Sequence, residues 1–87
     1  MSNEDLRANL FQINGILDIL SQLKKQNTEL ISELIKVRDT TDDLYSAGYF
    51  EGYLEGMKVA DEHLQLLSEM CVDFKETIVN ELASRML

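Results

Sequence analysis

A small residue recurs at every fourth position in the stretch Gly48-Tyr49-Phe50-Glu51-Gly52-Tyr53-Leu54-Glu55-Gly56-Met57-Lys58-Val59-Ala60. Inside a helix, each glycine costs about 1 kcal/mol relative to alanine. The flanking sequence is nevertheless strongly helical in pattern, so three glycines at this spacing need a physical reason. The usual reason is the close approach of another backbone along the stripe of small residues. The stretch therefore predicts a helix that another helix contacts at short range.

The composition of the whole chain favours helices. Its 87 residues suffice for one domain with a small core, and we expect a single helical domain over residues 1–87. There is no proline and no tryptophan, and there are only four glycines. Long uninterrupted helices are therefore allowed, and β-turn signals are nearly absent. We expect an all-α protein.

The first helix is expected over about residues 3–38, after a weak capping box formed by Ser2 and Asp5. Lys24 and Asn27 fall where the repeat calls for apolar residues, but the phase is the same on both sides of them. We therefore interpret one helix with a polar layer, in which a buried Asn27 fixes the register or the oligomeric state. The alternative is a loop at residues 24–27, which would give three helices. The apolar positions are Leu10, Ile13, Leu17, Leu20, Ile31 and Leu34, beside a flanking row of Ile16, Leu23, Leu30 and Val37.

The connection is expected at about residues 39–42. Thr40 and Thr41 are suited to N-cap a second helix, and the basic residues Lys36 and Arg38 suit the C-terminus of the first. Because no glycine or proline enforces the stop, a kink in one continuous helix is the alternative.

The second helix is expected over about residues 43–86, and its apolar arc is too wide for one antiparallel neighbour. A hairpin would leave part of that arc exposed, and contiguous exposed apolar patches mark association surfaces. We therefore expect a long antiparallel helical hairpin that self-associates into a four-helix-type bundle or coiled coil. Its main seam is predicted to be Tyr53, Met57, Ala60, Leu64, Leu67, Cys71, Phe74, Ile78 and Leu82. The predicted self-association surface comprises Gly48, Gly52, Gly56, Tyr49, Tyr53, Val59, His63, Leu66 and Met70.

The segment from Gly48 to Ala60 resembles the glycine-repeat segment of the stator proteins of flagellar and type III secretion systems. In that family an aromatic residue often follows each repeated glycine, and acidic residues come later in the unit. The resemblance implies helix–helix dimerisation alone. The features shared here are Gly48-Tyr49, Gly52-Tyr53, Glu51 and Glu55.

The net charge of −8 is confined to the second half of the chain. Residues 1–38 carry five acids and five bases, whereas residues 39–87 carry eleven acids and three bases. This balance disfavours direct binding to nucleic acid or to an anionic membrane, because both need a basic footprint. The acids are interpreted as a solvated surface or as a docking surface for a basic partner protein. The predicted partner-binding acidic face is Glu51, Glu55, Glu62 and Glu69.

No residue pattern indicates catalysis. His63 is the only histidine, and Val59 and Leu67 occupy the positions one turn away where a second metal ligand would be needed. Cys71 lies between apolar residues without a basic neighbour, which is typical of a small buried hydrophobe and not of a reactive thiolate. We expect no enzymatic activity, no cofactor and no metal.

The sequence thus predicts a non-enzymatic protein–protein interaction module, such as an adaptor, assembly factor or small chaperone. We expect it to work as a dimer or tetramer that also binds an unidentified protein partner. The alternative is an acidic inhibitor, of the kind phages encode, that blocks a basic nucleic-acid-binding surface of a target. The acidic N-terminal start, unlike a signal peptide, and the single cysteine predict a cytoplasmic protein without a membrane span.

Overall fold

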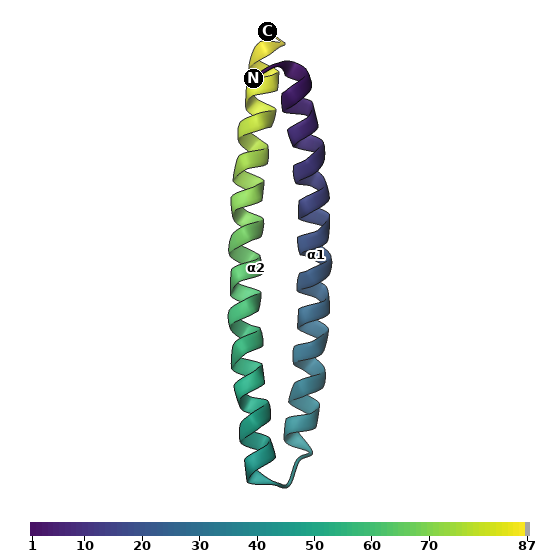
Figure 1. Cartoon of the computed structure of the whole chain (residues 1–87), viewed down its shortest axis with the longest axis vertical. Coiled ribbons are helices and arrows are strands. Elements are labelled where there is room, and N and C mark those ends of the chain that lie inside the picture. Colours follow the sequence, from purple (N-terminus) through teal and green to yellow (C-terminus); the bar gives the residue numbers. More distant parts are fainter. Residues whose placement is uncertain (87) are drawn as a thin grey trace.

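The computed structural model describes residues 1–86, which form two long helices and a short loop (Figure 1). Helix α1 spans Asn3–Asp39 and helix α2 spans Leu44–Arg85. The helices run antiparallel and side by side, so that both chain ends lie at one end of the molecule and the loop at the other (Figure 1). The Cα atoms extend over 66 × 15 × 15 Å. The predicted all-α hairpin is confirmed, and the alternative of one kinked helix is wrong.

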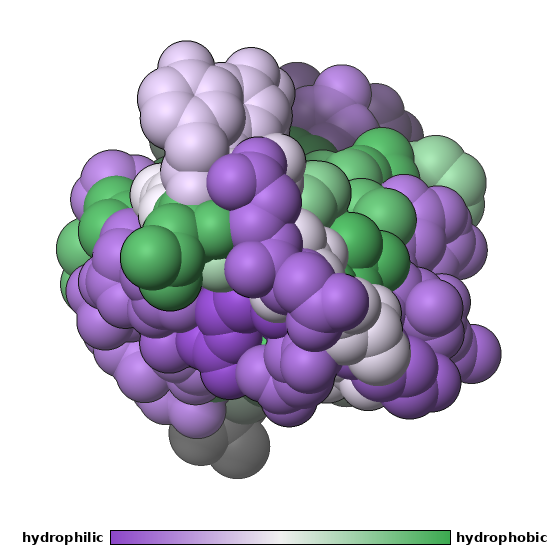
Figure 2. All heavy atoms as spheres, turned by 90° about the horizontal axis from the view of Figure 1, so that it is seen from below, coloured by the Kyte–Doolittle hydropathy of each residue, from purple (hydrophilic) through white to green (hydrophobic). Residues whose placement is uncertain are grey.

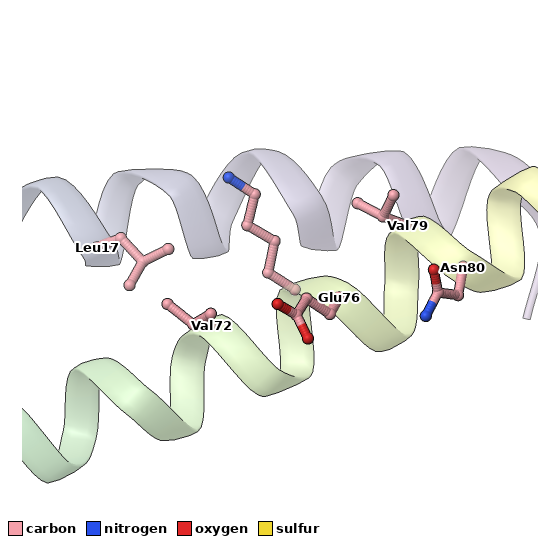
Figure 3. Close-up of a pocket in the computed structure, with 6 residues that line it drawn as sticks. Leu17, Val72, Glu76, Val79 and Asn80 are labelled. Carbon is pink, nitrogen blue, oxygen red and sulfur yellow. The ribbon is translucent and has the colours of Figure 1, made fainter.

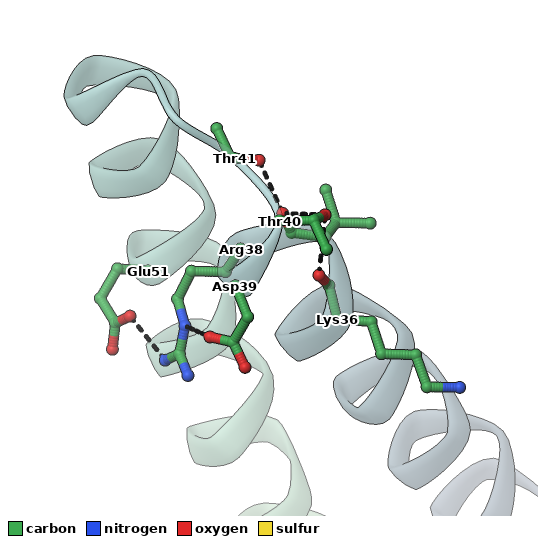
Figure 4. A network of polar contacts seen from close by, with 7 residues as sticks. Lys36, Arg38, Asp39, Thr40, Thr41 and Glu51 are labelled. Atoms are coloured by element: carbon green, nitrogen blue, oxygen red, sulfur yellow. Dashed lines mark hydrogen bonds and ion pairs between the residues drawn. The ribbon is translucent and has the colours of Figure 1, made fainter.

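Side-chain caps hold the ends of α1. Ser2 is the N-cap, and its hydroxyl accepts a hydrogen bond from the Asp5 backbone N–H at 3.1 Å. At the other end, the Thr40 hydroxyl donates to the Lys36 carbonyl at 3.0 Å, and the Thr41 hydroxyl donates to the Val37 carbonyl at 2.6 Å (Figure 4). The threonines thus satisfy carbonyls that the end of the helix leaves free. Their predicted role as N-caps of the second helix is wrong.

The N-cap of α2 is Asp43, and not Thr40 or Thr41. Its carboxylate accepts from the backbone N–H groups of Tyr45 at 3.3 Å and Ser46 at 3.2 Å, and from the Ser46 hydroxyl at 2.7 Å. These bonds, the hydroxyl bond first, lower the pKa of Asp43 because they favour its ionised form. Beside the loop, Arg38 joins the two helices by donating to Glu51 of α2 at 2.8 Å (Figure 4).

The core lies along the seam between the helices and is most apolar near the chain ends. Leu6, Ile13 and Ile78 form a buried cluster there. Toward the loop, Leu54 is the one fully buried large side chain among the described residues, with 0% of its surface exposed. The side chains packed against the buried cluster are Leu10, Leu17, Cys71 and Leu82.

A polar layer interrupts the seam near its middle, as predicted. The Asn27 side-chain amide donates to the backbone carbonyl of Met57 at 3.0 Å, and the Lys24 ammonium donates to the Gln65 side chain. Helix α1 continues through this layer without a break, so the predicted single helix is confirmed and the loop alternative is wrong. On α2, the Oδ1 atom of Asp61 is buried in the same region without a hydrogen-bond partner among residues 1–86.

Helix α2 is rotated relative to the predicted seam. The prediction places one row of α2 inside the hairpin, but its four members are exposed: Tyr53 (52%), Ala60, Leu67 (47%) and Phe74 (53%). This part of the prediction is wrong. The central row of α2 has an apolar row on one side and a partly polar row on the other, and one neighbouring helix covers only one of those sides. The row that turns toward α1, with members buried or half-buried, is Leu54, Asp61, Ser68, Lys75 and Leu82.

Candidate functional site

The exposed side of α2 carries two adjacent rows of mostly apolar residues at seven-residue steps. At 100° per residue, a seven-residue step returns a side chain to nearly the same face of a helix. Both rows run most of the length of α2 and are exposed throughout. One row is Tyr53, Ala60, Leu67 and Phe74, and the other is Tyr49, Gly56, His63 and Met70.

Helix α1 extends this surface across the seam. Its row of Ile16, Leu23, Leu30 and Val37 is exposed by between 42% and 55%. Leu23 and Leu30 line an open groove together with Ala60 and His63 of α2. The three rows, one from α1 and two from α2, are referred to below as the apolar face. The next groove toward the chain ends is formed by Ile16 of α1 with Leu67, Met70 and Phe74 of α2.

The view along the long axis from the loop end shows how polar and apolar residues are distributed over that end of the molecule (Figure 2). Hydrophobic residues reach the surface on both sides of the hairpin, and hydrophilic residues lie between them. The seam between the helices therefore buries only some of the apolar residues of this chain.

The tyrosines close the loop end of the apolar face. Tyr49 and Tyr53 pack edge to face, with ring centroids 4.9 Å apart and an interplanar angle of 80°. Their hydroxyl oxygens lie 3.0 Å apart, and this hydrogen bond raises the pKa of Tyr53. Both rings remain more than half exposed, so the pair presents an apolar surface with polar tips.

The glycines have no contact within the chain that requires them. Apart from the neighbouring backbone of α2 itself, a Cβ atom at Gly48, Gly52 or Gly56 would meet no atom of the described chain within 4 Å. A four-residue step advances about 40° around a helix. The series therefore moves from the outer surface at Gly48 onto the apolar face at Gly56 and Ala60. The prediction that another helix approaches these residues thus concerns a molecule outside this chain.

The opposite edge of the hairpin is more polar. Leu17 of α1 and Val72, Glu76, Val79 and Asn80 of α2 line an open groove of about 480 Å³ there (Figure 3). Its lining includes the charged side chains of Lys75 and Glu76, whereas the polar groups in the two grooves of the apolar face are amides and the His63 imidazole.

Three of the four residues predicted to form an acidic face lie in one exposed row. Glu55, Glu62 and Glu69 recur every seven residues, which places them about 10 Å apart along one side of α2. Glu51 lies apart from this row, since it is half-buried and paired with Arg38 at 2.8 Å. The structure therefore brings together three of the predicted acidic residues and uses the fourth to tie α2 to α1.

Two further properties concern metal ions and membranes. No group of three or more His, Cys, Asp or Glu side chains in residues 1–86 is arranged to hold a metal ion, and His63 is exposed. Neither α1 nor α2 contains a segment long and apolar enough to cross a membrane.

Sequence reasoning missed two features of the site. It left Leu54 out of the seam, although that side chain is fully buried. It also assigned the self-association surface to α2 alone, whereas the α1 row beginning at Ile16 lies beside it. The seven-residue repeat of Leu54, Asp61, Ser68 and Lys75 was visible, but three of its members are polar and therefore do not signal burial.

No protein-family model matches this chain, and no curated protein or solved structure matches it either. The resemblance to the stator proteins therefore stays confined to the segment from Gly48 to Ala60. What the chain does is inferred from its residues and their arrangement.

Proposed function

We propose that this chain is a non-enzymatic protein-interaction module that works as a homo-oligomer, in which hairpins associate through the apolar face into a four-helix-type bundle. The observation that carries this proposal is which row of α2 is turned toward α1 and which row is left exposed. The row turned toward α1 includes Asp61, Ser68 and Lys75, whereas the row with Leu67 and Phe74 lies outside. A hairpin that worked alone would gain more by burying the more apolar row. The arrangement is favourable if a second hairpin covers that row.

The surface area of the chain supports association. The hairpin exposes 6544 Å², whereas a compact monomer of 10.0 kDa exposes about 5,200 Å². The excess is about 1,300 Å², and a stable interface of standard size buries about 800 Å² per partner. Pairing two hairpins side by side would bring the exposed surface per chain toward that of a compact protein.

Within such an oligomer, the acidic row would remain available to another protein. Glu55, Glu62 and Glu69 lie toward the edge of α2 that faces away from the apolar face, so that self-association would leave them in solvent. Their regular spacing and the net charge of −8 suit a basic protein partner. We therefore assign the apolar face to self-association and the acidic row to a second partner, as in an adaptor or assembly factor.

The second candidate function is inhibition of a nucleic-acid-binding protein by the acidic row. The linear series of carboxylates, about 10 Å apart, favours it. The two functions differ in salt dependence, because exposed charge contacts are screened by salt and apolar contacts are not. Binding of a target that survives half-molar salt and charge reversal at Glu55, Glu62 and Glu69 would exclude the inhibitor.

The decisive experiment is the solution mass by light scattering after size exclusion, at micromolar concentration. We expect about 20 kDa for a dimer or about 40 kDa for a tetramer, compared with 10.0 kDa for one chain. A well-folded monomer would overturn the proposal.

A pair of matched variants links the mass to the apolar face. Leu67→Glu places a charge on the face, whereas Val79→Glu places one on the opposite edge, and the two positions are exposed by 47% and 43%. We expect Leu67→Glu to give a monomer and Val79→Glu to retain the wild-type mass. Equal effects of both variants would mean that association does not use this face.

A further inference from the structure

We infer that the partner on the apolar face is a second copy of this chain in antiparallel orientation, with its loop at the opposite end and α2 packed against the partner's α2 around a centre at Leu67. This inference rests on the proposed self-association and specifies its geometry. Three observations carry it: the sizes of the side chains on the two sides of Leu67, the length of surface to be covered, and the chemistry at the two ends.

Small and large side chains lie on opposite sides of Leu67 in the middle of the apolar face. On the loop side of Leu67 lie Gly56 and Ala60, with the tyrosines beyond them, and on the other side lie the large residues Met70 and Phe74. Leu67 lies between these groups. In an antiparallel pair centred on Leu67, Phe74 meets the partner's Ala60 and Leu67 meets the partner's Leu67. The large Phe74 then faces the small Ala60 on either side of the centre, which keeps the distance between the helices even there.

If α2 packed against the partner's α2 in a parallel arrangement, like side chains would meet. Ala60 would meet the partner's Ala60, and Phe74 would meet the partner's Phe74. Because side chains at the contact set the distance between helix axes, two α2 helices would approach closely at one end and separate at the other. Two hairpins 66 Å long would then lose contact over part of their length. Protein interfaces are packed as densely as protein interiors, so such a gap is unfavourable.

The centre at Leu67 also gives nearly full overlap. Leu67 lies close to the middle of α2, which spans Leu44–Arg85. A pair centred on the glycines, near Gly52, would leave the half of the face around Phe74 uncovered. The surplus surface extends over the whole hairpin, and only a central crossing point covers it on both copies.

The two ends of the face are chemically complementary in this arrangement. Tyr53 would meet the partner's Glu81, which is a polar acceptor for its hydroxyl group. On α1, Ile16 would meet the partner's Leu30, and Leu23 would meet the partner's Leu23. The acidic row that begins at Glu55 stays away from the contact, so that the charges of the two copies do not face each other across it.

Energy transfer between labelled copies tests the orientation. In a Cys71→Ser background, Asp42→Cys marks the loop end and Ser84→Cys marks the other end of the hairpin. The two positions are exposed and lie about 63 Å apart along α2. We expect strong transfer when donor-labelled Asp42→Cys chains are mixed with acceptor-labelled Ser84→Cys chains. Donor and acceptor chains that both carry Asp42→Cys should show little transfer.

Each other outcome overturns the inference. Strong transfer between two Asp42→Cys chains would show parallel hairpins, and the proposed self-association would stand. Equal transfer in both mixtures would show that the copies have no fixed orientation. If the wild-type chain is a monomer by light scattering, both the inference and the proposed function fail.

A size exchange, made with Cys71 intact, tests the register. Ala60→Phe should overfill the contact and Phe74→Ala should leave a gap, so each change alone should raise the dimer dissociation constant by about tenfold or more. The double variant should recover most of that loss, because residues 60 and 74 of the two copies meet. Additive losses in the double variant would show that they do not meet.

Discussion

The two halves of the hairpin hold together in different ways. Near the chain ends, Leu6, Ile13 and Ile78 form a buried apolar cluster. Near the loop, the helices are joined by Leu54, by the bond from Asn27 to the Met57 carbonyl, and by the Arg38–Glu51 ion pair. The first half depends on a cluster of buried side chains, whereas the second combines one fully buried side chain with directional polar contacts.

This difference teaches how one chain reconciles folding with association. Apolar contacts are non-directional, and a pair of uniformly apolar helices could slide by a turn at little cost. The polar layer favours one register, because the half-buried amide of Asn27 keeps its bond to the Met57 carbonyl only in that register. With the register fixed near the middle, α2 keeps the same side packed against α1. Its apolar face therefore stays exposed and does not replace that side in the seam.

The largest expected effect is on the apolar half. Ile78→Ala removes a side chain from the cluster, and we expect the free energy of unfolding to fall by about 2–5 kcal/mol. Leu54→Ala should cost less, since Leu54 lies outside the buried cluster near the chain ends. Urea denaturation followed by circular dichroism measures both. Val79→Ala, at an exposed neighbouring position, is the control and should change the free energy by about 0.5 kcal/mol or less. A larger loss for Leu54→Ala than for Ile78→Ala would contradict the comparison.

A smaller effect of opposite sign is expected in the polar layer. Asn27→Leu replaces a half-buried amide by an apolar side chain, so we expect the urea midpoint to rise. The same change should make the oligomer less uniform, with more than one species by size exclusion, since the register is no longer fixed. Gln26→Leu, at the adjacent exposed position, serves as the control for added hydrophobicity. A single species with an unchanged mass would show that Asn27 does not fix the register.

The smallest effect is expected at the loop and depends on pH. The pKa of Asp43 is lowered in the folded chain, first by the Ser46 hydroxyl and then by two backbone N–H groups. The folded state therefore binds fewer protons than the unfolded state, and stability rises with pH in this range. The contribution is complete above the ordinary aspartate pKa of 3.8 and is lost as the pH falls through the lowered value.

Two variants at this position separate capping from charge. Asp43→Ala should lower the thermal midpoint at neutral pH, and the difference from wild type should shrink as the pH falls below 3.8. Asp43→Asn keeps a capping oxygen without the charge, so its midpoint should lie closer to wild type at neutral pH. A difference for Asp43→Ala that is constant down to strong acid would rule out the ionised carboxylate as the stabilising group.

Most of the fold follows from local signals in the sequence. Steps of three and four in α1, the caps at its start and the break after Arg38 suffice for a hairpin of two long helices. The polar layer at Asn27 was also predictable, because the phase of the apolar pattern is the same before and after it.

The rotation of α2 could not be predicted in the same way. The central row of Met57, Leu64, Cys71 and Ile78 has an apolar row on one side, with Leu67 and Phe74, and a partly polar row on the other. Apolar periodicity predicts burial of the row with Leu67 and Phe74, whereas the hairpin buries the partly polar row. Periodicity reports that a surface is buried, but it does not report which partner covers it. The sequence therefore predicts part of the candidate site on α2, at Gly56, His63 and Met70, but places Leu67 and Phe74 inside the hairpin and misses the extension onto α1.

The antiparallel packing of α1 against α2 within one chain has a consequence for the kinetics of folding. Near the loop, Arg38 and Glu51 are 13 residues apart in the sequence, whereas Ile13 and Ile78 in the terminal cluster are 65 apart. The Arg38–Glu51 contact costs the least chain entropy to form, but it is weaker than the apolar cluster. The contacts of that cluster form only after almost the whole chain has been closed into a loop. A hairpin formed halfway from the loop would have lost its chain entropy without gaining the terminal cluster. We therefore expect each chain to fold in one cooperative step, with no populated intermediate in which only the loop end is formed.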